Sequence, residues 1–547
     1  MPDDKSSPAL SLGECMKNLL LTLGHNSSAI LVEDGEIKWG YETERITGVK
    51  SDSRFPEAVM SMMNVKPDAA YITHWAPDGI LSSMSQKHYR PDLLDGVKII
   101  THNPDITHHD THMAAAVCYA GPGFHRGDRT YCLVVDGFGT YGEHLSLYKL
   151  EKAQTTLVRR VHGYNTSLGL WYQYATAFMG MKMHEDEYKL LGYEVHVNPI
   201  DAEQLDADAR LRAYDWLQEM SASIYTSPFD PVYNLNALPA IRERINRELT
   251  AVCTAYNIGD PTNMAGRAIL SYYVQAVLEQ VILQFLGDYN WDNLLCSGGV
   301  FYNVKLNKIL LDKTNGQLCI YPLAGDQGNA IGLYSMWNPR FYFPEDLNWG
   351  LRELKDVGQV KNLHVCDWSK GLALVQELLD KVGYVNLVRG NMEFGPRAMC
   401  NTSTLAKPSM DNVMTINRMN DRNTVMPMAP VMNLSTYHYM FERHKHVWKS
   451  YAHMILAMEY TEHPEGWYLG VSHEYQRPYH HHTGRPQVIQ PSDVFMTHVL
   501  EKYGMLINTS FNFHGKPIAF NMESIIDNHM MQFVRNPDIH TVVIQNA

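Results

Sequence analysis

Apolar residues near the start of the chain come in short runs that are broken by turn residues. The run "NLLLTLG" at 18–24 predicts a buried strand. Residues 27–44 follow, with Asp34-Gly35 between two further apolar stretches, which is a strong hairpin signal. The pattern returns at 130–151, where an apolar strand ends in Asp-Gly-x-Gly and a second strand follows. Two such units predict a duplicated sheet-and-helix fold of the α/β class.

Glycine-rich strand ends mark the middle of the chain. A long apolar helix is expected over 266–286, followed by a strand at 293–297 and the glycines of "GGVFYN" at 298–303. In "LAGDQGNAIG" at 323–332, a Gly-Asp turn precedes small residues that open a helix. Glycines let a ligand approach the backbone, and strand ends of this kind bind nucleotides in α/β folds.

The composition changes at 337–365 to proline, aromatic and charged residues, which predicts a domain boundary. We expect one domain over 1–350 and a second over 351–547. In the second domain, 384–398 and 504–518 are predicted strands that run into polar loops. The length of 547 residues exceeds what a single hydrophobic core supports.

Charge and cysteine content narrow the class of protein. The net charge of −13 argues against a bulk nucleic-acid binder, which is usually basic. The eight cysteines form no CxxC pair, which suits the reducing cytosol, and the acidic start "MPDDKSSPAL" is unlike a signal peptide. The apolar stretch 268–287 contains Gln and Glu and is expected to be a buried helix. We therefore expect a cytoplasmic protein without a membrane partner.

The stretch "NPDITHHDTHMAAA" at 103–116 combines histidines with small apolar residues. His108 and His112 are four residues apart, so a helix places both imidazoles on one face, as two ligands of one metal ion require. The zinc-protease pattern HExxH does not fit, because His109 occupies the glutamate position.

Further ligands must come from elsewhere in the chain. Asp136 and Asp326 are the best candidates, because both are beside glycines at predicted strand ends. The alternative interpretation is a helix N-terminus capped by Asp105 or Thr107, with histidines that are solvated or hydrogen-bonded. His25, in "LGHNSSA", is a further histidine that follows a strand.

Arginines are found in or beside several loops of the second half. A planar guanidinium group donates two bonds at once, which suits phosphate and carboxylate groups. The alternative for each arginine is an ion pair with a surface acid. The arginines are Arg389, Arg397, Arg422 and Arg485. The loops "SGGVFYN" and "VDGFG" match neither the Walker A nor the GxGxxG pattern, so by themselves they predict tight turns.

Taken together, these stretches resemble the carbamoyltransferase family of nodulation and antibiotic-biosynthesis enzymes. The resemblance runs in order through "GHNSSAILVEDGEIKWGYETERITGVK", "THHDTHMAAA", "VVDGFG", "MHEDEYKLLG", "LLCSGGVFYNVKLN", "AGDQGNAIG", "RGNMEFGPRAMCNTSTLAKP", "HTGRPQ" and "LINTSFNFHGKPIAF". It implies an N-terminal duplicated domain of the ASKHA type (actin/hexokinase-like, RNase H-like). It also implies a C-terminal YrdC-like α/β domain.

The resemblance further implies a two-step reaction. The YrdC-like domain takes carbamoyl phosphate and ATP with Mg²⁺ and makes carbamoyl adenylate, releasing phosphate and pyrophosphate. The N-terminal domain then passes the carbamoyl group to an acceptor hydroxyl with the help of a metal. His108, His112 and Asp326 would be its ligands, and Asp136 a direct or outer ligand. Iron(II) is the metal that the resemblance favours, and manganese or zinc fit the same ligand types.

The remaining roles follow from the same resemblance. His25 would orient or deprotonate the acceptor hydroxyl, as an imidazole can near neutral pH, and Lys50 would be near it. The nucleotide residues of the first domain would be Lys189 near the phosphate and Gly298, Gly299 and Asn303 at the adenosine. The residues of the second domain would be Arg389, Arg422, Asn508, Ser510 and Asn512, with Arg397 and Arg485 as catalytic groups.

Two departures from the family pattern affect this site. "HNSSA" replaces the usual "HDASA", so the acid beside His25 is missing. The family's KxR element is Asn420-Asp421-Arg422 here, so its lysine is missing too. Arg418 or Lys407 are the alternatives for the replacement cation.

The acceptor is open between two classes of hydroxyl compound. One is the hydroxymethyl group of a modified pyrimidine, such as 5-hydroxymethylcytosine, in phage DNA or as a nucleotide. The other is a small natural product or a sugar. Alternatives from other classes are a threonylcarbamoyl-type tRNA modification protein and a non-catalytic nucleotide sensor, and "EFGPRAMCNTS" favours the carbamoyl branch. A homodimer is compatible with each of these readings.

Overall fold

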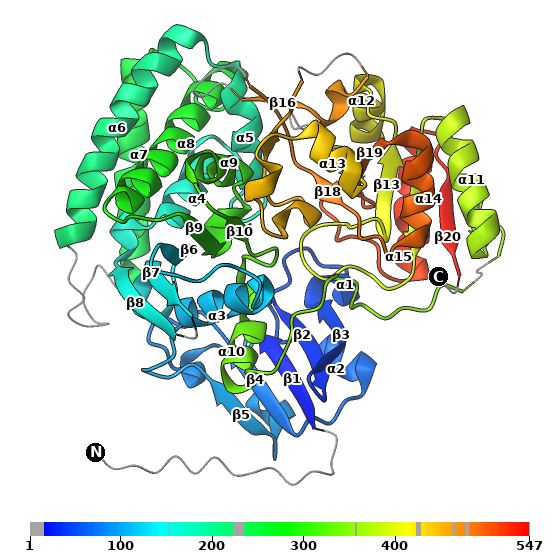
Figure 1. Cartoon of the computed structure of the whole chain (residues 1–547), viewed down its shortest axis with the longest axis horizontal. Coiled ribbons are helices and arrows are strands. Elements are labelled where there is room, and N and C mark those ends of the chain that lie inside the picture. The colour runs from blue at the N-terminus through cyan, green and yellow to red at the C-terminus, as the bar shows by residue number, and fades with distance from the viewer. Residues whose placement is uncertain are drawn as a thin grey trace.

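The chain folds into three large sheets, a small fourth sheet and the helices that cover them (Figure 1). The computed structural model describes residues 16–152, 154–222, 235–355, 358–422, 428–462, 467–475 and 481–545. The architecture is mixed α/β, as the sequence predicts.

The first sheet has the strand order β3-β2-β1-β4-β5. β1 pairs antiparallel with β2 and parallel with β4. The predicted hairpin is confirmed between β2 and β3, where Asp34 and Gly35 have φ angles of 52° and 81°, as a tight two-residue turn requires. The strands are β1 (Lys17–Thr22), β2 (Ser28–Glu33), β3 (Glu36–Glu42), β4 (Ala69–Thr73) and β5 (Lys98–Thr101).

The second sheet repeats this topology. Its order is β10-β9-β6-β7-β8, with β6 antiparallel to β7 and parallel to β9. The first three strands of each unit form an antiparallel meander, and the last two add in parallel on the other side. The predicted duplication is therefore confirmed. The strands are β6 (Thr130–Val135), β7 (Glu143–Glu151), β8 (Gln154–His162), β9 (Asn293–Ser297) and β10 (Leu318–Ile320).

Two helices pack between these sheets. α3 (His108–Ala120) and α10 (Asn329–Trp337) pack against each other and share one apolar core with residues of both sheets (Figure 1). The contact is close because small residues face each other. A Cβ added to Gly332 of α10 would be 1.9 Å from the carbonyl oxygen of Thr111 in α3.

A bundle of long helices covers the outer side of the second sheet (Figure 1, left). Its members are α4 (Leu168–Phe178), α6 (Pro199–Ala222), α7 (Leu238–Ala255) and α8 (Met264–Gly287). Among the described residues, α8 alone is long and apolar enough to cross a membrane, but 78% of the tested window is buried inside the protein. α8 is thus the buried helix that the sequence predicts.

The third sheet is built from the last third of the chain, in the order β11-β20-β12-β13-β19-β14-β18. α11 (Trp368–Lys381) and α14 (Val494–Tyr503) share a core with one face of the sheet, and α15 (Met522–Arg535) packs on the other. The YrdC-like character of this unit stays a prediction. The strands are β11 (Leu363–Cys366), β12 (Tyr384–Arg389), β13 (Thr402–Ala406), β14 (Ala429–Met432), β18 (Gln487–Val488), β19 (Met505–Ser510) and β20 (Thr541–Ile544).

The predicted boundary at residue 350 falls between the end of α10 and the start of β11 and stays a prediction.

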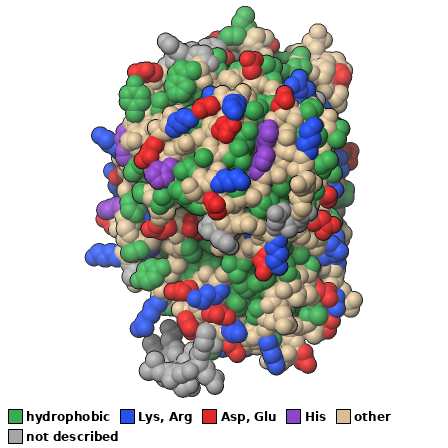
Figure 2. Space-filling view, turned by 90° about the vertical axis from the view of Figure 1, so that its right-hand side faces the viewer, with side chains coloured by type: hydrophobic (Ala, Val, Ile, Leu, Met, Phe, Trp, Pro, Cys, Tyr) green, Lys and Arg blue, Asp and Glu red, His purple; other side chains and the backbone are tan. Residues whose placement is uncertain are grey.

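Figure 2 shows the outer face of the unit built on the third sheet. Acidic and basic side chains are interspersed over it, unlike the continuous basic surface of many nucleic-acid binders.

The segment between β14 and β18 returns to the N-terminal half. The backbone N–H of Trp448 donates to the carbonyl of Leu318 in β10 at 2.8 Å. The side chain of Asn307, in α9 (Val304–Lys313), donates to the carbonyl of Ile455 at 2.7 Å. The two halves therefore share a packed interface, and the cavity described below opens along it.

Candidate active site

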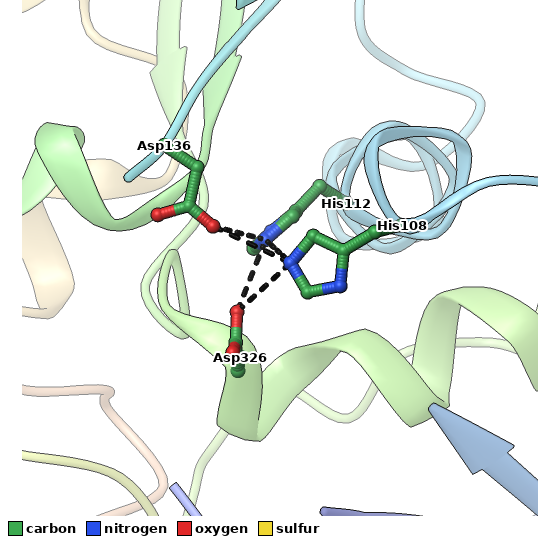
Figure 3. A group of neighbouring side chains, drawn as sticks. All are labelled: His108, His112, Asp136 and Asp326. Carbon is green, nitrogen blue, oxygen red and sulfur yellow. Dashed lines mark hydrogen bonds and ion pairs between the residues drawn. The ribbon is translucent and has the colours of Figure 1, made fainter. Parts of the chain in front are cut away.

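Four side chains from three separate segments converge at the carboxyl end of β6 (Figure 3). α3 presents His108 and His112, Asp136 directly follows β6, and Asp326 begins the short turn that leads into α10. The Nε2 atom of His108 is 3.1 Å from Asp326 Oδ1 and 3.4 Å from Asp136 Oδ2. The Nε2 atom of His112 is 3.3 Å from Asp136 Oδ2 and 3.4 Å from Asp326 Oδ1. The structure thus brings together the four residues for which the sequence predicts a metal.

The hydrogen bonds behind the imidazoles fix their orientation. His108 Nδ1 is 3.1 Å from the carbonyl oxygen of His74, which can only accept, so Nδ1 carries a proton and Nε2 is the nitrogen that a metal could bind. His112 Nδ1 is 3.4 Å from the hydroxyl of Ser297. The two Nε2 atoms are 3.2 Å apart. Outer hydrogen bonds of this kind orient the histidine ligands of many metal sites.

This donor set fits a divalent cation. One ligand atom from each of the four residues lies within 4.8 Å of the others, and both imidazoles are buried. Burial acts to raise the pKa of Asp136, but its hydrogen bonds with His108 and His112 lower it to about 2. The site therefore combines two carboxylate oxygens with two imidazole nitrogens, a set that suits iron(II), manganese or zinc.

The start of α3 explains which neighbours stay outside this cluster. Thr107 caps the helix, as the alternative interpretation of the sequence predicts, and Asp110 completes the capping box. Asp110 also accepts from Arg160 at 2.6 Å. His109 Nδ1 is 2.8 Å from the hydroxyl of Ser146. Capping and metal-ligand geometry therefore coexist in one helix.

Glycines bring the backbone of the strand ends close to the cluster. A Cβ on Gly299 would be 2.9 Å from Asp136 Oδ1, and a Cβ on Gly139 would be 2.9 Å from the side chain of His108. Gly298 has a φ of 101° and lies directly against the carbonyl of Val135. These glycines therefore allow close contacts within the protein at the strand ends, and the approach of a ligand to them stays a prediction.

One cavity of about 620 Å³ extends from this cluster to the third sheet. Most of the residues to which the sequence assigns a role line it. They are His25, Lys50, Asp136, Gly299, Asn303, Asp326, Arg397, Arg422, Arg485, Asn508, Ser510 and Asn512. His25 Nδ1 is 3.9 Å from Asp326 Oδ2, and Lys50 donates to Glu44 at 2.9 Å.

The end of the cavity at the third sheet is rich in arginine. Arg422 is held by β19 and the loop after it, donating to the Thr509 hydroxyl at 2.8 Å and to Asn512 Oδ1 at 2.9 Å. Arg397 and Arg485 have no carboxylate partner among the residues that the structure describes. Burial, with the like charge of Arg397, lowers the pKa of Arg485 to about 9. A half-buried cationic site without a matching acid suits an anionic ligand.

Three of the expected nucleotide-binding residues are not brought to the cavity wall. Arg389 makes a two-bond ion pair with Asp493, at 2.5 and 3.0 Å, which is the alternative foreseen for each arginine. Lys189 pairs with Asp186 at 2.8 Å. Gly298 lies behind its neighbour Gly299, which does line the cavity.

The structure also gives the cavity residues that sequence reasoning missed. Lys305 lines it and forms a fully buried ion pair with Glu194. His184, with a φ of 65°, has its ring 5.8 Å from that of His25. Lys516 lines the arginine end. The available signal was that all four residues fall within or next to motifs of the family resemblance, "MHEDEYKLLG", "VKLN" and "FNFHGKPIAF".

Comparison with known proteins assigns both halves of the chain to one family. The model described as "Carbamoyltransferase N-terminus" matches residues 83–334, and the model described as "Carbamoyltransferase C-terminus" matches residues 376–546. An uncharacterized protein of Methanocaldococcus jannaschii is 26% identical, with 93% of this chain and 95% of that protein covered. The nodulation protein NolO of Bradyrhizobium diazoefficiens is 26% identical over 59% of this chain and 58% of its own length.

Solved structures are more distant. The activator of 2-hydroxyisocaproyl-CoA dehydratase from Clostridium difficile, with bound ADPNP, has 12% sequence identity and a TM-score of 0.33. The match covers 59% of this chain and 95% of that one. A likeness at this level says nothing about activity.

Proposed function

We propose that this chain, which belongs to the carbamoyltransferase family, carbamoylates an acceptor hydroxyl by way of carbamoyl adenylate, using carbamoyl phosphate and ATP. Membership of the family shows that the chain is a carbamoyltransferase enzyme. The use of ATP, the adenylate intermediate and the hydroxyl acceptor are what we propose. One observation carries it. A single cavity joins a cluster of two histidines and two aspartates at one end to three arginines at the other.

The arginine end suits the first half-reaction. Water cleaves carbamoyl phosphate to carbamate and phosphate, and a carbamate oxygen then attacks the α-phosphorus of ATP and expels pyrophosphate. Both partners are anions, so fixed cations must offset their repulsion. Arg397 and Arg485, which have no acidic partner among the described residues, and Arg422, held by Asn512, would supply these charges.

The histidine end suits the transfer. His108, His112, Asp136 and Asp326 would hold a divalent cation, which as a Lewis acid would polarise the carbamoyl carbonyl. His25 would accept the proton of the acceptor hydroxyl as its oxygen attacks the carbamoyl carbon and AMP leaves. Its side chain is 52% exposed and therefore accessible from the cavity.

The acceptor would be recognised by hydrogen bonds more than by charge. The walls around His25 are polar, and two of their carboxylates are paired with lysines. Glu44 binds Lys50 at 2.9 Å, and Asp186 binds Lys189 at 2.8 Å. We therefore propose a hydroxylated acceptor with several uncharged hydrogen-bonding groups. The hydroxymethyl group of a modified pyrimidine and a sugar or other small natural product are the classes to assay.

The test separates the two half-reactions. The wild type should release pyrophosphate from ATP and carbamoyl phosphate. His108→Ala should still do so but should fail to transfer the group to an acceptor. His125→Ala, an exposed histidine outside the cavity, is the matched control. Normal transfer by His108→Ala would remove the role given to the cluster.

Mass spectrometry identifies the acceptor by the gain of one carbamoyl group. A panel of 5-hydroxymethylcytosine in DNA, its free nucleotide, sugars and hydroxylated natural products distinguishes the two classes. Pyrophosphate release that requires threonine and bicarbonate in place of carbamoyl phosphate would indicate the tRNA-modification alternative. A wild type that binds ATP but releases no pyrophosphate under either condition would indicate the nucleotide sensor.

A further inference from the structure

The arginine end of the cavity is missing the lysine that the family pattern places at position 420. Asn420 is completely buried, and its side-chain oxygen accepts from Gln532 at 2.5 Å. It therefore faces α15 and not the cavity. The two replacements considered from the sequence are also absent from the wall: Arg418 is exposed elsewhere, and Lys407 pairs with Asp380 at 3.9 Å.

We propose that Lys516 takes over this function and binds the phosphate chain of the nucleotide; the inference rests on the proposed use of ATP at this end. Lys516 lines the cavity together with Arg422 and Ser510. Its side chain is exposed, and its Nζ atom forms no hydrogen bond or ion pair with any part of the chain that the structure describes. It is therefore a cation available to a ligand.

The loop that carries Lys516 is fixed to the arginine site. Asn512 connects the two cations, since its Oδ1 atom accepts from Arg422 at 2.9 Å and its Nδ2 atom donates to the carbonyl of Lys516 at 2.8 Å. The backbone N–H of His514 donates to the carbonyl of Asn420 at 2.9 Å. Residue 420 therefore contributes no cation to the site, but its backbone carbonyl anchors the loop that carries Lys516.

A tight turn fixes the backbone at Lys516. The N–H of Lys516 donates to the carbonyl of Phe513 at 3.0 Å, and Gly515 has a φ of 78°, which favours glycine. The N–H of Phe513 in turn donates to Asn528 Oδ1 of α15 at 2.7 Å. The backbone of the turn is thus fixed, while the long ammonium side chain can still adjust to a ligand.

The chemistry of the two substrates predicts which one Lys516 serves. Arg422 is committed to Thr509, Ser510 and Asn512, so its free donors are few. A triphosphate carries more charge than carbamoyl phosphate and extends further, so it gains more from a mobile point charge at the rim. Lys516 should therefore determine the affinity for ATP and have little influence on that for carbamoyl phosphate.

The experiment compares full-length wild type, Lys516→Met, Lys516→Arg and the control Lys407→Met. Loss of one charge-assisted contact should raise KM for ATP about tenfold in Lys516→Met. KM for carbamoyl phosphate should change less than about twofold, Lys516→Arg should restore most of the ATP affinity, and Lys407→Met should match the wild type. An unchanged KM for ATP in Lys516→Met, or an equal rise for both substrates, would overturn the assignment.

A binding measurement separates this inference from the proposed reaction. Calorimetry with a non-hydrolysable ATP analogue measures affinity without turnover. If the wild type releases no pyrophosphate from ATP in the presence of carbamoyl phosphate, but binds the analogue about tenfold more tightly than Lys516→Met, the proposed reaction is wrong and the role of Lys516 stands. Equal affinities for the analogue would reject that role whether or not the reaction occurs.

Discussion

The close packing of α3 on α10 makes Gly332→Ala a direct test of how the histidine–aspartate cluster is held. The added Cβ would be 1.9 Å from the carbonyl oxygen of Thr111 and 2.8 Å from the backbone nitrogen of Ala115. Both neighbours are backbone atoms of α3, so no side chain can rotate out of the way. The helices must move apart.

The size of this movement follows from the contact distances. Ordinary van der Waals contact begins at 3.4 Å, so about 1.5 Å of separation is needed at this point. α3 carries His108 and His112, and the turn before α10 carries Asp326, at 3.1 to 3.4 Å from them. Metal–ligand distances tolerate only about 0.2 Å, so a shift of even half this size should lower metal affinity roughly 100-fold.

The assay combines metal content with the two half-reactions. Gly332→Ala should contain little bound metal by elemental mass spectrometry after reconstitution, and should lose carbamoyl transfer while keeping pyrophosphate release. Gly287→Ala is the matched control, because it is also a helical glycine and its added Cβ has no atom within 4 Å. It gives the effect of alanine's higher helix propensity alone.

A Gly332→Ala variant that retains the metal content and transfer rate of Gly287→Ala would contradict this prediction. Such a result would mean that the helices separate without moving the ligands, or that the cluster holds no metal. Loss of both half-reactions together would point to general misfolding, which comparison of their circular dichroism spectra would reveal.

Three further predictions concern the same site. Burial acts to lower the pKa of His108, but Asp326 raises it well above its usual value, so protons compete with a metal at low pH. Metal affinity should therefore rise from pH 6 to pH 8 in a competition titration, and a pH-independent affinity would contradict this. Glu194→Ala removes a carboxylate that pairs with the buried Lys305, and it should destabilise the fold by about 3–5 kcal/mol in urea unfolding. Adding Lys305→Met should recover part of the loss, and additive effects would contradict the pairing. Arg485 has a pKa lowered to about 9 by burial and a neighbouring arginine, so its charge is unfavourable in the fold at pH 7. Arg485→Gln should raise the melting temperature and abolish the stabilisation by pyrophosphate, and an undiminished pyrophosphate effect would contradict its anion-binding role.

Local patterns in the sequence were sufficient for the parts of the fold that depend on neighbouring residues. The turn at Asp34-Gly35, the helix that begins at His108 and the glycines at strand ends each express a backbone preference that acts within a few residues. The duplication was also predictable, because the same hairpin pattern occurs twice.

The sequence could name charged residues but not their partners. Arg389 and Arg485 both follow strand-and-loop patterns, yet Arg389 is neutralised by Asp493 and Arg485 faces the cavity. Nothing local distinguishes them, since the pairing depends on a helix more than one hundred residues away. The same applies to the pair formed by Glu194 and Lys305.

The ligand types and the helical spacing of His108 and His112 follow from the amino-acid pattern, because both imidazoles belong to one turn of one helix. That Asp136 and Asp326 meet them, and that Lys516 and not residue 420 lines the arginine end, could be seen only in the folded protein. The position of a side chain on its helix is set locally, whereas its neighbours across a cavity depend on how whole sheets and helices pack.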